Sequence, residues 1–422
     1  MLDTKFIREN PEIVKKAVKD KQLAGTVDID ELLDVESRYL DLLRKVETKR
    51  ALKNELSDGI SKVAPEAREK LISEATQVKN DLTELESELK ISKESLDKLL
   101  LKVPNIPAND VPYGEGEEGN EVIREEGKKP TFDFEPKDHM DLGVGLDIID
   151  TERGTKIAGF RGYFLKNDGV LLHRALMDYA LDLIRNKGFD ILEVPWMVNR
   201  DAFVGTGYFP WGEEDHYTVQ DDLSLIGSAE VSLTSYYANE VLEEKDLPVK
   251  LAGVSPCFRR EIGTYGKDMK GILRTHQFTK VEQVVLVPEG EEVSRDWHEQ
   301  LLRNAEELLK QLGLSYRVML MCTGDMGPGQ RKKFDIETWF PSQNTYRETH
   351  SDSYFLDFQA RRLNIKYRAK DGSLKYVSTL NNTLAASPRL MAAVMENYQQ
   401  KDGSIKVPDV LLPYMRGVKE LR

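Results

Sequence analysis

The chain has 422 residues, which is long enough for two or three domains and for a sizeable hydrophobic core. Its composition, 40% apolar and 32% charged with a net charge of −13, excludes the disordered and collagen-like classes of protein. No stretch approaches the about 18 consecutive apolar residues of a transmembrane helix, and acids interrupt the opening residues where a signal peptide needs an apolar core. We therefore expect a cytoplasmic protein with no membrane partner.

The two cysteines, Cys257 and Cys322, lie far apart and outside any CxxC or Cys/His ligand spacing. This pattern argues against a disulfide framework and against a structural zinc site. We expect both thiols to be reduced and structural, and no zinc to be bound.

A heptad pattern of apolar residues predicts two long helices in the first hundred residues, at 32–63 and 71–103. Pro65 suits the start of the second helix, and the short connection at 63–66 makes the pair antiparallel. At 1.5 Å per residue, each helix would be on the order of 50 Å long. The pattern therefore predicts a projecting helical arm at about residues 29–103, within an N-terminal domain of residues 1–103.

The predicted arm contains a basic stretch, because residues 44–62 carry six bases against three acids. Lys49 and Lys53 stand at positions where the heptad pattern has apolar residues, so the helix pair loses hydrophobic packing there. This loss is explained if the two cations face phosphates. The candidate nucleic-acid contacts are Arg44, Lys45, Lys49, Arg50 and Lys53. A heptad pattern taken alone also fits a dimerisation hairpin or a spacer, so this alternative stays open.

Residues 104–130 are rich in Pro and Gly and carry seven acids between Asp110 and Glu126, which predicts an acidic linker or a loose surface segment. From residue 131 to 422, helical stretches such as 171–187 mix with short β-rich runs. These runs are residues 189–198, 281–287 and 376–380. No GxGxxG or GxxxxGK[ST] loop supports a Rossmann or P-loop site, so an α+β domain with an antiparallel sheet is predicted for residues 131–422.

Residues 255–261 and 274–282 flank a loop with Gly263, Gly266 and Gly271, which is typical of a hairpin. If both flanks are strands, alternate side chains share a face. One such face carries Arg259 and Glu261, and the other strand adds Arg274, His276, Phe278, Lys280 and Glu282. Charges at this density must pair, face solvent or meet a ligand, and arginines beside a phenyl ring suit the phosphates and the base of a purine nucleotide. A solvated face with surface ion pairs remains the alternative.

Three segments resemble, in order, the three motifs of class II aminoacyl-tRNA synthetases, and nearly the whole chain resembles the seryl-tRNA synthetase family. Residues 188–195, which end at Pro195, resemble motif 1 with its interface proline. Motif 2 is resembled by Arg259-Arg260-Glu261 with Arg274 and Phe278, and motif 3 by residues 384–398 with Arg389. Residues 341–348, 357–362 and 396–399 are also near-verbatim family sequence, and the helical hairpin resembles the tRNA-binding arm. The resemblance implies a class II synthetase-like antiparallel sheet with flanking helices, preceded by the coiled-coil arm.

The resemblance also implies an ATP site, in which Arg259 holds the α-phosphate while Arg274 and Arg389 hold the outer phosphates. These arginines are the implied catalytic residues. Adenine would lie between Phe278 and the Arg389 side chain, and Glu261 would contact its amino group. The implied ATP-binding residues are Arg259, Arg260, Glu261, Arg274, Phe278, Glu348, Thr349, His350, Ser351 and Arg389. Glu348 and Ser351 correspond to the family's Mg²⁺ positions, which agrees with the preference of Mg²⁺ for a few hard oxygen ligands.

For the amino acid, the resemblance points to a pocket for the zwitterion and the hydroxyl of L-serine. The implied serine-binding residues are Ser228, Ala229, Glu230, Arg259, Glu282, Asn381 and Thr383. An ammonium needs an anion, a carboxylate needs a cation, and a hydroxyl needs polar partners that alanine would leave unpaired.

The chain departs from the commonest bacterial pattern in several places. Ser228 stands where that pattern has threonine, and residues 381–383 replace an Asn-Gly-Ser sequence. Thr349 and His350 replace small residues beside the metal position, and residues 352–355 replace a Cys-Ser-Asn-Cys-like stretch. His350 fits a packing role better than a chemical one, because a lone histidine rarely implies chemistry.

The resemblance implies an enzyme that activates L-serine with ATP, with Mg²⁺ as cofactor, and transfers the seryl group to tRNA(Ser). tRNA(Sec) is a further candidate acceptor. A homodimer across the motif 1 region is also implied, in which each arm reaches the tRNA on the partner subunit. Two other readings stay open: a ligase that charges a carrier protein, whose relatives typically lack the arm, and a catalytically silent paralogue that binds RNA or protein.

Overall fold

The computed structural model describes residues 1–61, 65–262 and 271–422. Lys62, Val63, Gly263 and Gly266 of the sequence patterns lie outside the described residues. The chain forms two compact units, Leu2–Pro104 and a second unit that contains Met1 and Asn105–Arg422. Both cysteines are free and buried. None of the helices described combines the length and the apolar character that a membrane span requires.

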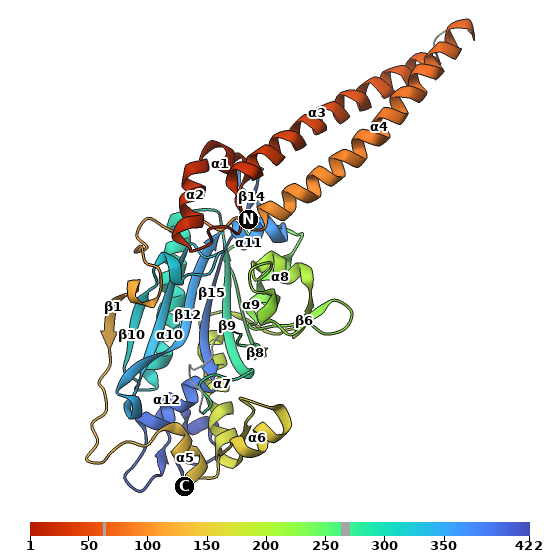
Figure 1. The fold of residues 1–422 in the computed structure, drawn as a ribbon. Helices are drawn as coiled ribbons and strands as arrows, with labels where there is room; N and C mark the ends of the chain where they lie inside the picture. Colours follow the sequence, from red (N-terminus) through yellow and green to blue (C-terminus); the bar gives the residue numbers. More distant parts are fainter. Residues whose placement is uncertain (62–64, 263–270) are drawn as a thin grey trace. The chain divides into compact units, whose positions relative to one another are not determined.

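The N-terminal unit contains the two predicted long helices (Figure 1). Its helices are α1 (Thr4–Glu9), α2 (Pro11–Asp20), α3 (Ile29–Ile60) and α4 (Pro65–Leu100). The Asp28 carboxylate caps α3 by accepting hydrogen bonds from the N–H groups of Asp30 and Glu31. Apolar side chains such as Val46 and Leu82 are buried along the antiparallel pair. The heptad pattern thus predicted both helices to within a few residues of their bounds.

Two of the five candidate cations of the arm pair with acids on the facing helix. Lys49 Nζ lies 2.6 Å from Asp81 Oδ2, and Arg50 lies 2.7 Å from Glu86 Oε1. Lys49 lowers the pKa of Asp81 through this hydrogen bond. The interpretation of Lys49 as a cation displayed to phosphates is therefore revised, because a cross-helix ion pair occupies its place in the seam.

An eight-stranded sheet organises the second unit. Its strand order is β1 (Glu121–Glu126), β10 (Tyr316–Leu320), β11 (Lys332–Phe340), β12 (Thr345–Leu356), β15 (Ser378–Ser387), β9 (Gln277–Val287), β8 (Val249–Phe258) and β4 (Asp190–Glu193). Neighbouring strands are antiparallel except for the β4–β8 pair, which is parallel. The predicted α+β architecture with an antiparallel sheet is therefore found.

Helices and smaller sheets surround this sheet. The helices are α5 (His139–Gly145), α6 (Thr151–Ala158), α7 (Asn167–Asn186), α8 (Arg200–Thr206), α9 (Glu230–Thr234), α10 (Glu291–Gln311), α11 (Phe358–Leu363) and α12 (Arg389–Asn397). The smaller sheets pair β2 (Ile149–Asp150) with β3 (Phe164–Leu165), β5 (Met197–Asn199) with β6 (Leu223–Leu225), β16 (Ile405–Lys406) with β17 (Glu420–Leu421), and join β14 (Leu374–Tyr376), β13 (Lys366–Arg368) and β7 (Val241–Glu243).

The predicted elements of this unit differ in accuracy. Helix 171–187 is found as α7, and residues 281–287 lie within β9. The run 189–198 is not one strand, because it splits into β4 and β5 around Pro195, which lacks the N–H that a ladder needs. The run 376–380 likewise spans the end of β14 and the start of β15.

The segment at 104–130, expected as a linker, is mostly part of the second unit. Residues 121–126 form the edge strand β1, which pairs with β10. The buried Asn105 side chain donates hydrogen bonds to the carbonyls of Gly329 and Phe355, at 3.0 and 2.8 Å. The expectation of a loose linker is therefore wrong for residues 105–130, because tertiary hydrogen bonds override their Pro- and Gly-rich composition.

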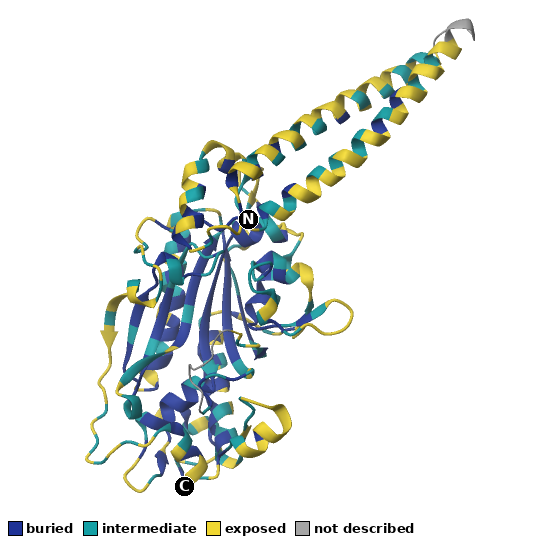
Figure 2. Ribbon diagram, viewed as in Figure 1, coloured by how far each residue is buried: buried dark blue, intermediate teal, exposed yellow. Residues whose placement is uncertain are grey.

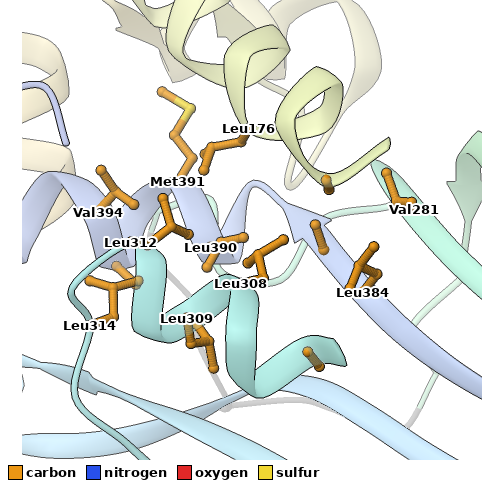
Figure 3. Close-up of a cluster of buried hydrophobic side chains, with 14 of the residues drawn as sticks. Leu176, Val281, Leu308, Leu309, Leu312, Leu314, Leu384, Leu390, Met391 and Val394 are labelled. Carbon is orange, nitrogen blue, oxygen red and sulfur yellow. The ribbon is translucent and has the colours of Figure 1, made fainter. Parts of the chain in front are cut away.

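The main hydrophobic core lies on the face of the sheet that α7, α10 and α12 cover. Figure 2 shows the central strands of the sheet as mostly buried. Figure 3 shows Leu308 of α10 and Leu390 of α12 gathered with Leu384 and Val281 of the strands. Because side chains alternate along a strand, Lys280 and its same-parity neighbours on β9 point to the opposite face. At one end of that opposite face a second apolar cluster packs against α8, α9 and α11. The rest of this face is free to form a polar site.

Candidate active site

A cavity of about 330 Å³ opens on the polar face of the sheet. Strands β9, β11, β12 and β15 supply its floor, and the starts of α9 and α12 supply its ends. The predicted site residues that line it are Glu230, Arg259, Glu261, Arg274, Phe278, Glu282, Glu348, Thr349, His350, Ser351, Asn381, Thr383 and Arg389. Residues from four separate stretches of sequence thus meet in one place.

Three predicted site residues do not line this cavity. Arg260 is exposed and turns away, because its guanidinium NH1 donates to the Glu214 carbonyl at 3.0 Å. Ala229 is buried at the start of α9. Ser228 is also buried, and its hydroxyl lies 2.8 Å from Lys280 Nζ. Ser228 therefore contacts Lys280, which lines the cavity, but does not line the cavity itself.

The predicted hairpin is shorter than the sequence pattern suggested. Strand β8 ends at Phe258 and β9 begins at Gln277, so Arg259, Glu261, Arg274 and His276 lie just beyond the strands. The Arg259 N–H still donates to the His276 carbonyl at 3.0 Å, but Glu261 adopts φ +55°, which ends the pairing. Alternation along a strand therefore explains the shared face of Phe278, Lys280 and Glu282 only. Arg274 meets Glu261 instead through a hydrogen bond of 2.5 Å from its NH1.

Backbone carbonyls orient two of the predicted catalytic arginines. Arg259 Nε donates to the Gly227 carbonyl at 3.2 Å, and its guanidinium carbon lies 5.2 Å from the centre of the Phe278 ring. Arg389, the first residue of α12, donates from NH1 to the Glu348 carbonyl at 2.6 Å and from Nε to the Leu273 carbonyl at 3.2 Å. The Arg259 side chain donates to a neutral acceptor, which leaves its charge available to an anion, whereas Arg389 NH1 also lies 3.4 Å from the Glu348 carboxylate.

Glu348 and Ser351 are oxygen donors on the same strand, β12. The Glu348 side chain is 49% exposed, and its Oε2 lies 3.4 Å from Arg389 NH1. Although burial works against it, Arg389 and Lys333 hold the pKa of Glu348 below its usual range, so the carboxylate is ionised. Ser351 lies opposite Asp335 on β11, and Asp335 Oδ1 is buried without a hydrogen-bond partner among the described residues. Carboxylate and hydroxyl oxygens, one of them unsatisfied, fit a hard cation such as Mg²⁺.

The opposite end of the cavity holds two buried carboxylates. Glu230 accepts hydrogen bonds from the Tyr208 hydroxyl at 2.8 Å and from Gln359 Nε2 at 2.9 Å. Burial, followed by repulsion from Glu282, raises the pKa of Glu230 to about 7. Glu282 forms an ion pair with Lys280. An ammonium group is the ligand that would relieve the repulsion at this end.

His350 lies in the wall of the cavity and is 1% exposed. Its Nδ1 lies 2.8 Å from the Thr349 hydroxyl, and burial lowers its pKa to about 4. The ring is therefore neutral, which agrees with a packing role.

Sequence reasoning missed several residues that line the cavity, among them Tyr208, Gln330 and Lys333. Lys280 was placed on the correct face but was not assigned to the site. The residues 333–337 of β11 alternate polar and apolar, a period-2 pattern that could have identified Lys333. Tyr208 and Gln330 lie outside strands and gave no such signal.

Comparisons with known proteins find relatives over the whole length of the chain. Residues 1–107 match the family model of the seryl-tRNA synthetase N-terminal domain, and residues 214–398 match the class II tRNA synthetase core domain for G, H, P, S and T. A serine–tRNA ligase of Deinococcus radiodurans is 44% identical over 418 residues, which cover 99% of this chain and 98% of that protein. The chain belongs to the seryl-tRNA synthetase family.

Three further relatives support this assignment to the seryl-tRNA synthetase family. The serine–tRNA ligase of Thermodesulfovibrio yellowstonii is 45% identical over the full length of both chains. The crystal structure of the seryl-tRNA synthetase from Pyrococcus horikoshii complexed with ATP superposes with a TM-score of 0.92 at 40% identity, and covers 100% of this chain and 99% of that chain. The structure of a cytoplasmic enzyme from Naegleria fowleri with AMP gives 0.87 at 31% identity, with the same coverage. The predicted family, class II fold and serine–tRNA ligase activity are confirmed.

Proposed function

We propose that the 330 Å³ cavity binds ATP and L-serine side by side and joins them as seryl-adenylate. The observation that carries this assignment is the polarity of the cavity. Arg274 and Arg389 gather with Phe278 around one end, where Glu261 and Glu348 pair with them. The buried carboxylates Glu230 and Glu282 occupy the other end. The first end suits the phosphates and base of ATP, and the second suits the ammonium of an amino acid.

In the first step, the serine carboxylate attacks the α-phosphorus of ATP and pyrophosphate leaves. Two anions must approach in line, so catalysis comes from positioning and from charge neutralisation by the arginines. Arg259 lies between the two ends and contacts both the serine carboxylate and the α-phosphate. Glu348 and Ser351 would hold Mg²⁺, which would neutralise part of the phosphate charge when bound. In the second step, the 3′-hydroxyl of the terminal adenosine of tRNA loses its proton and attacks the carbonyl carbon of seryl-adenylate, so that the ester bond forms, the acyl–phosphate bond breaks and AMP leaves.

We propose that the arm binds tRNA(Ser), with tRNA(Sec) as a further candidate acceptor. Within the described part of the arm, Lys45 and Lys53 form no ion pair, whereas Lys49 and Arg50 are neutralised by α4. Lys45, Lys53 and the exposed Arg44 are therefore the strongest phosphate contacts of the five candidates.

We propose that the protein forms a homodimer across the motif 1 region. We also propose that it acts in the cytoplasm, since the relative from Naegleria fowleri is described as a cytoplasmic enzyme. Exposed apolar side chains support the interface: Ile191 is 40%, Trp196 44% and Met197 54% exposed within seven residues of sequence. Met197→Glu should convert dimer to monomer in sedimentation velocity. Leu374→Glu, at a residue 51% exposed on β14, is the matched control. A wild-type monomer, or a dimer in both variants, would contradict the interface.

The experiment that tests the reaction is serine-dependent ATP–pyrophosphate exchange without tRNA, with alanine, threonine, glycine and cysteine run alongside. Arg259→Ala should nearly abolish exchange. Arg260→Ala is the matched control, because that neighbouring arginine points away from the cavity. Near-normal exchange in Arg259→Ala, or exchange with none of the amino acids in wild type, would sink the assignment.

A further inference from the structure

A buried lysine lies among the side chains that we assign to serine. Lys280 of β9 is 5% exposed, and its Nζ donates a hydrogen bond of 2.8 Å to the Ser228 hydroxyl. The same ammonium forms an ion pair with Glu282 and lies 3.5 Å from the Thr383 hydroxyl. A buried ammonium is costly unless such partners satisfy it, and here all of its partners come from the serine end of the cavity.

Lys280 makes the two carboxylates of this end different. Glu282 has the Lys280 ammonium as its counter-ion. Glu230 instead accepts hydrogen bonds from two neutral groups, the Tyr208 hydroxyl and the Gln359 amide. Among the described residues, Glu230 has no ion-pair partner, and an ammonium ligand gains most beside such an anion, so the serine ammonium belongs beside Glu230.

The hydrogen-bond geometry leaves a position for the serine hydroxyl beside Glu282. A lysine ammonium has three donors, and two of them are well used by Ser228 and Glu282. The third contact, to Thr383 at 3.5 Å, is long for a hydrogen bond and can be exchanged for a better acceptor. A hydroxyl at that point would accept from Lys280 and donate to Glu282.

We propose that Lys280 is a positioning and specificity-determining residue that reserves Glu282 and Thr383 for the serine side-chain hydroxyl and leaves Glu230 for the ammonium. This inference rests on the proposed serine site. Alanine, which lacks the hydroxyl, would leave the Lys280 and Glu282 groups desolvated without the partner that completes them. Discrimination against alanine is thereby assigned to a lysine that the ligand roles above do not use.

Lys280→Met tests the proposal, because methionine keeps much of the side-chain length but removes the charge and the donors. The readouts are the KM for serine and the Ki of alanine as a competitive inhibitor, both in the exchange reaction. We expect the KM for serine to rise about 10- to 100-fold, the loss typical of a hydrogen bond to a charged group. The Ki of alanine should change less than about threefold, since alanine makes no contact with this group.

Two more variants separate specificity from structure. Lys280→Gln keeps a donor for Ser228 without the charge, so its serine KM should fall between those of wild type and Lys280→Met. Lys250→Met is the matched control on β8, where the lysine donates to the Lys187 carbonyl at 2.9 Å outside the cavity. Its serine KM should be unchanged. Thermal unfolding and the KM for ATP, measured for every variant, show that each one folds and keeps the nucleotide site.

A proportional rise in the serine KM and the alanine Ki would overturn the proposal and leave Lys280 as a structural counter-ion. An unchanged serine KM would overturn it as well. Failure of the proposed function looks different, because wild type itself would then show no serine-dependent exchange.

Discussion

Serine binding should depend on pH through Glu230. This carboxyl faces Glu282 and Lys280 from β9, the Tyr208 hydroxyl, and the Gln359 amide from α11. Burial and the charge of Glu282 raise the pKa of Glu230 from 4.5 to about 7. Because only the ionised carboxyl can pair with an ammonium, the binding-competent form is lost as pH falls through 7.

The size of the effect follows from the ionised fraction. With a pKa of about 7, about one tenth of the Glu230 carboxyls are ionised at pH 6 and about nine tenths at pH 8. The apparent dissociation constant is the intrinsic one divided by this fraction, so it should be about tenfold higher at pH 6 than at pH 8. Below pH 7, binding should also release close to one proton, since the serine ammonium favours the ionised carboxyl.

Calorimetric titration with serine at several pH values, in two buffers of different ionisation enthalpy, measures both quantities. Glu230→Gln is the control, because it keeps the shape and loses the titration. This variant should bind serine more weakly and with little dependence on pH between 6 and 8. A wild-type affinity that is constant over this range, or a pH dependence that survives in Glu230→Gln, would refute the reasoning.

Three further predictions test other parts of the molecule. Deletion of residues 30–100 should spare serine-dependent exchange but raise the KM for tRNA greatly, and an unchanged KM in aminoacylation would contradict the role of the arm. Lys333→Met should raise the KM for ATP several-fold, because Lys333 lines the cavity together with Arg274, and Lys332→Met should leave it unchanged, because Lys332 is not among the residues that line the cavity and pairs with Asp110. Leu308→Ala, at a fully buried residue of α10, should lower the free energy of unfolding by about 2–5 kcal/mol in urea titrations; a loss well under 1 kcal/mol would show that the core tolerates the cavity.

The sequence predicted the elements whose formation depends on residues close together in the chain. The heptad spacing predicted α3 and α4, whereas most of the predicted residues that line the cavity were implied by the resemblance to the synthetase family. The errors occurred where partners come from distant parts of the chain. Residues 105–130 were predicted as a linker because their composition does not indicate that β1 forms hydrogen bonds with the edge of β10.

The arm shows the same limit for electrostatics. Lys49 interrupts the heptad pattern, and along the sequence it reads as an exposed cation. Its counter-ion Asp81 lies on the other helix, 32 residues away, so only the pairing of the two helices reveals it. The number of cations along one helix therefore overstates how many of them are available to bind phosphates. The ion-pair partners of each cation must be known before a ligand is assigned to it.

In the active site, by contrast, the informative observation is a carboxylate, Glu230, that has no counter-ion in the part of the chain that the structure describes. Lys280 and Glu282 form an ion pair, so each already has a counter-ion. Glu230 is held by neutral donors beside a second carboxylate, an arrangement that is costly in the empty cavity. Sequence alone gives both glutamates the same role, since each resembles a serine contact. Only the three-dimensional placement of Lys280 distinguishes them, and it assigns the ammonium to Glu230 and the hydroxyl to Glu282.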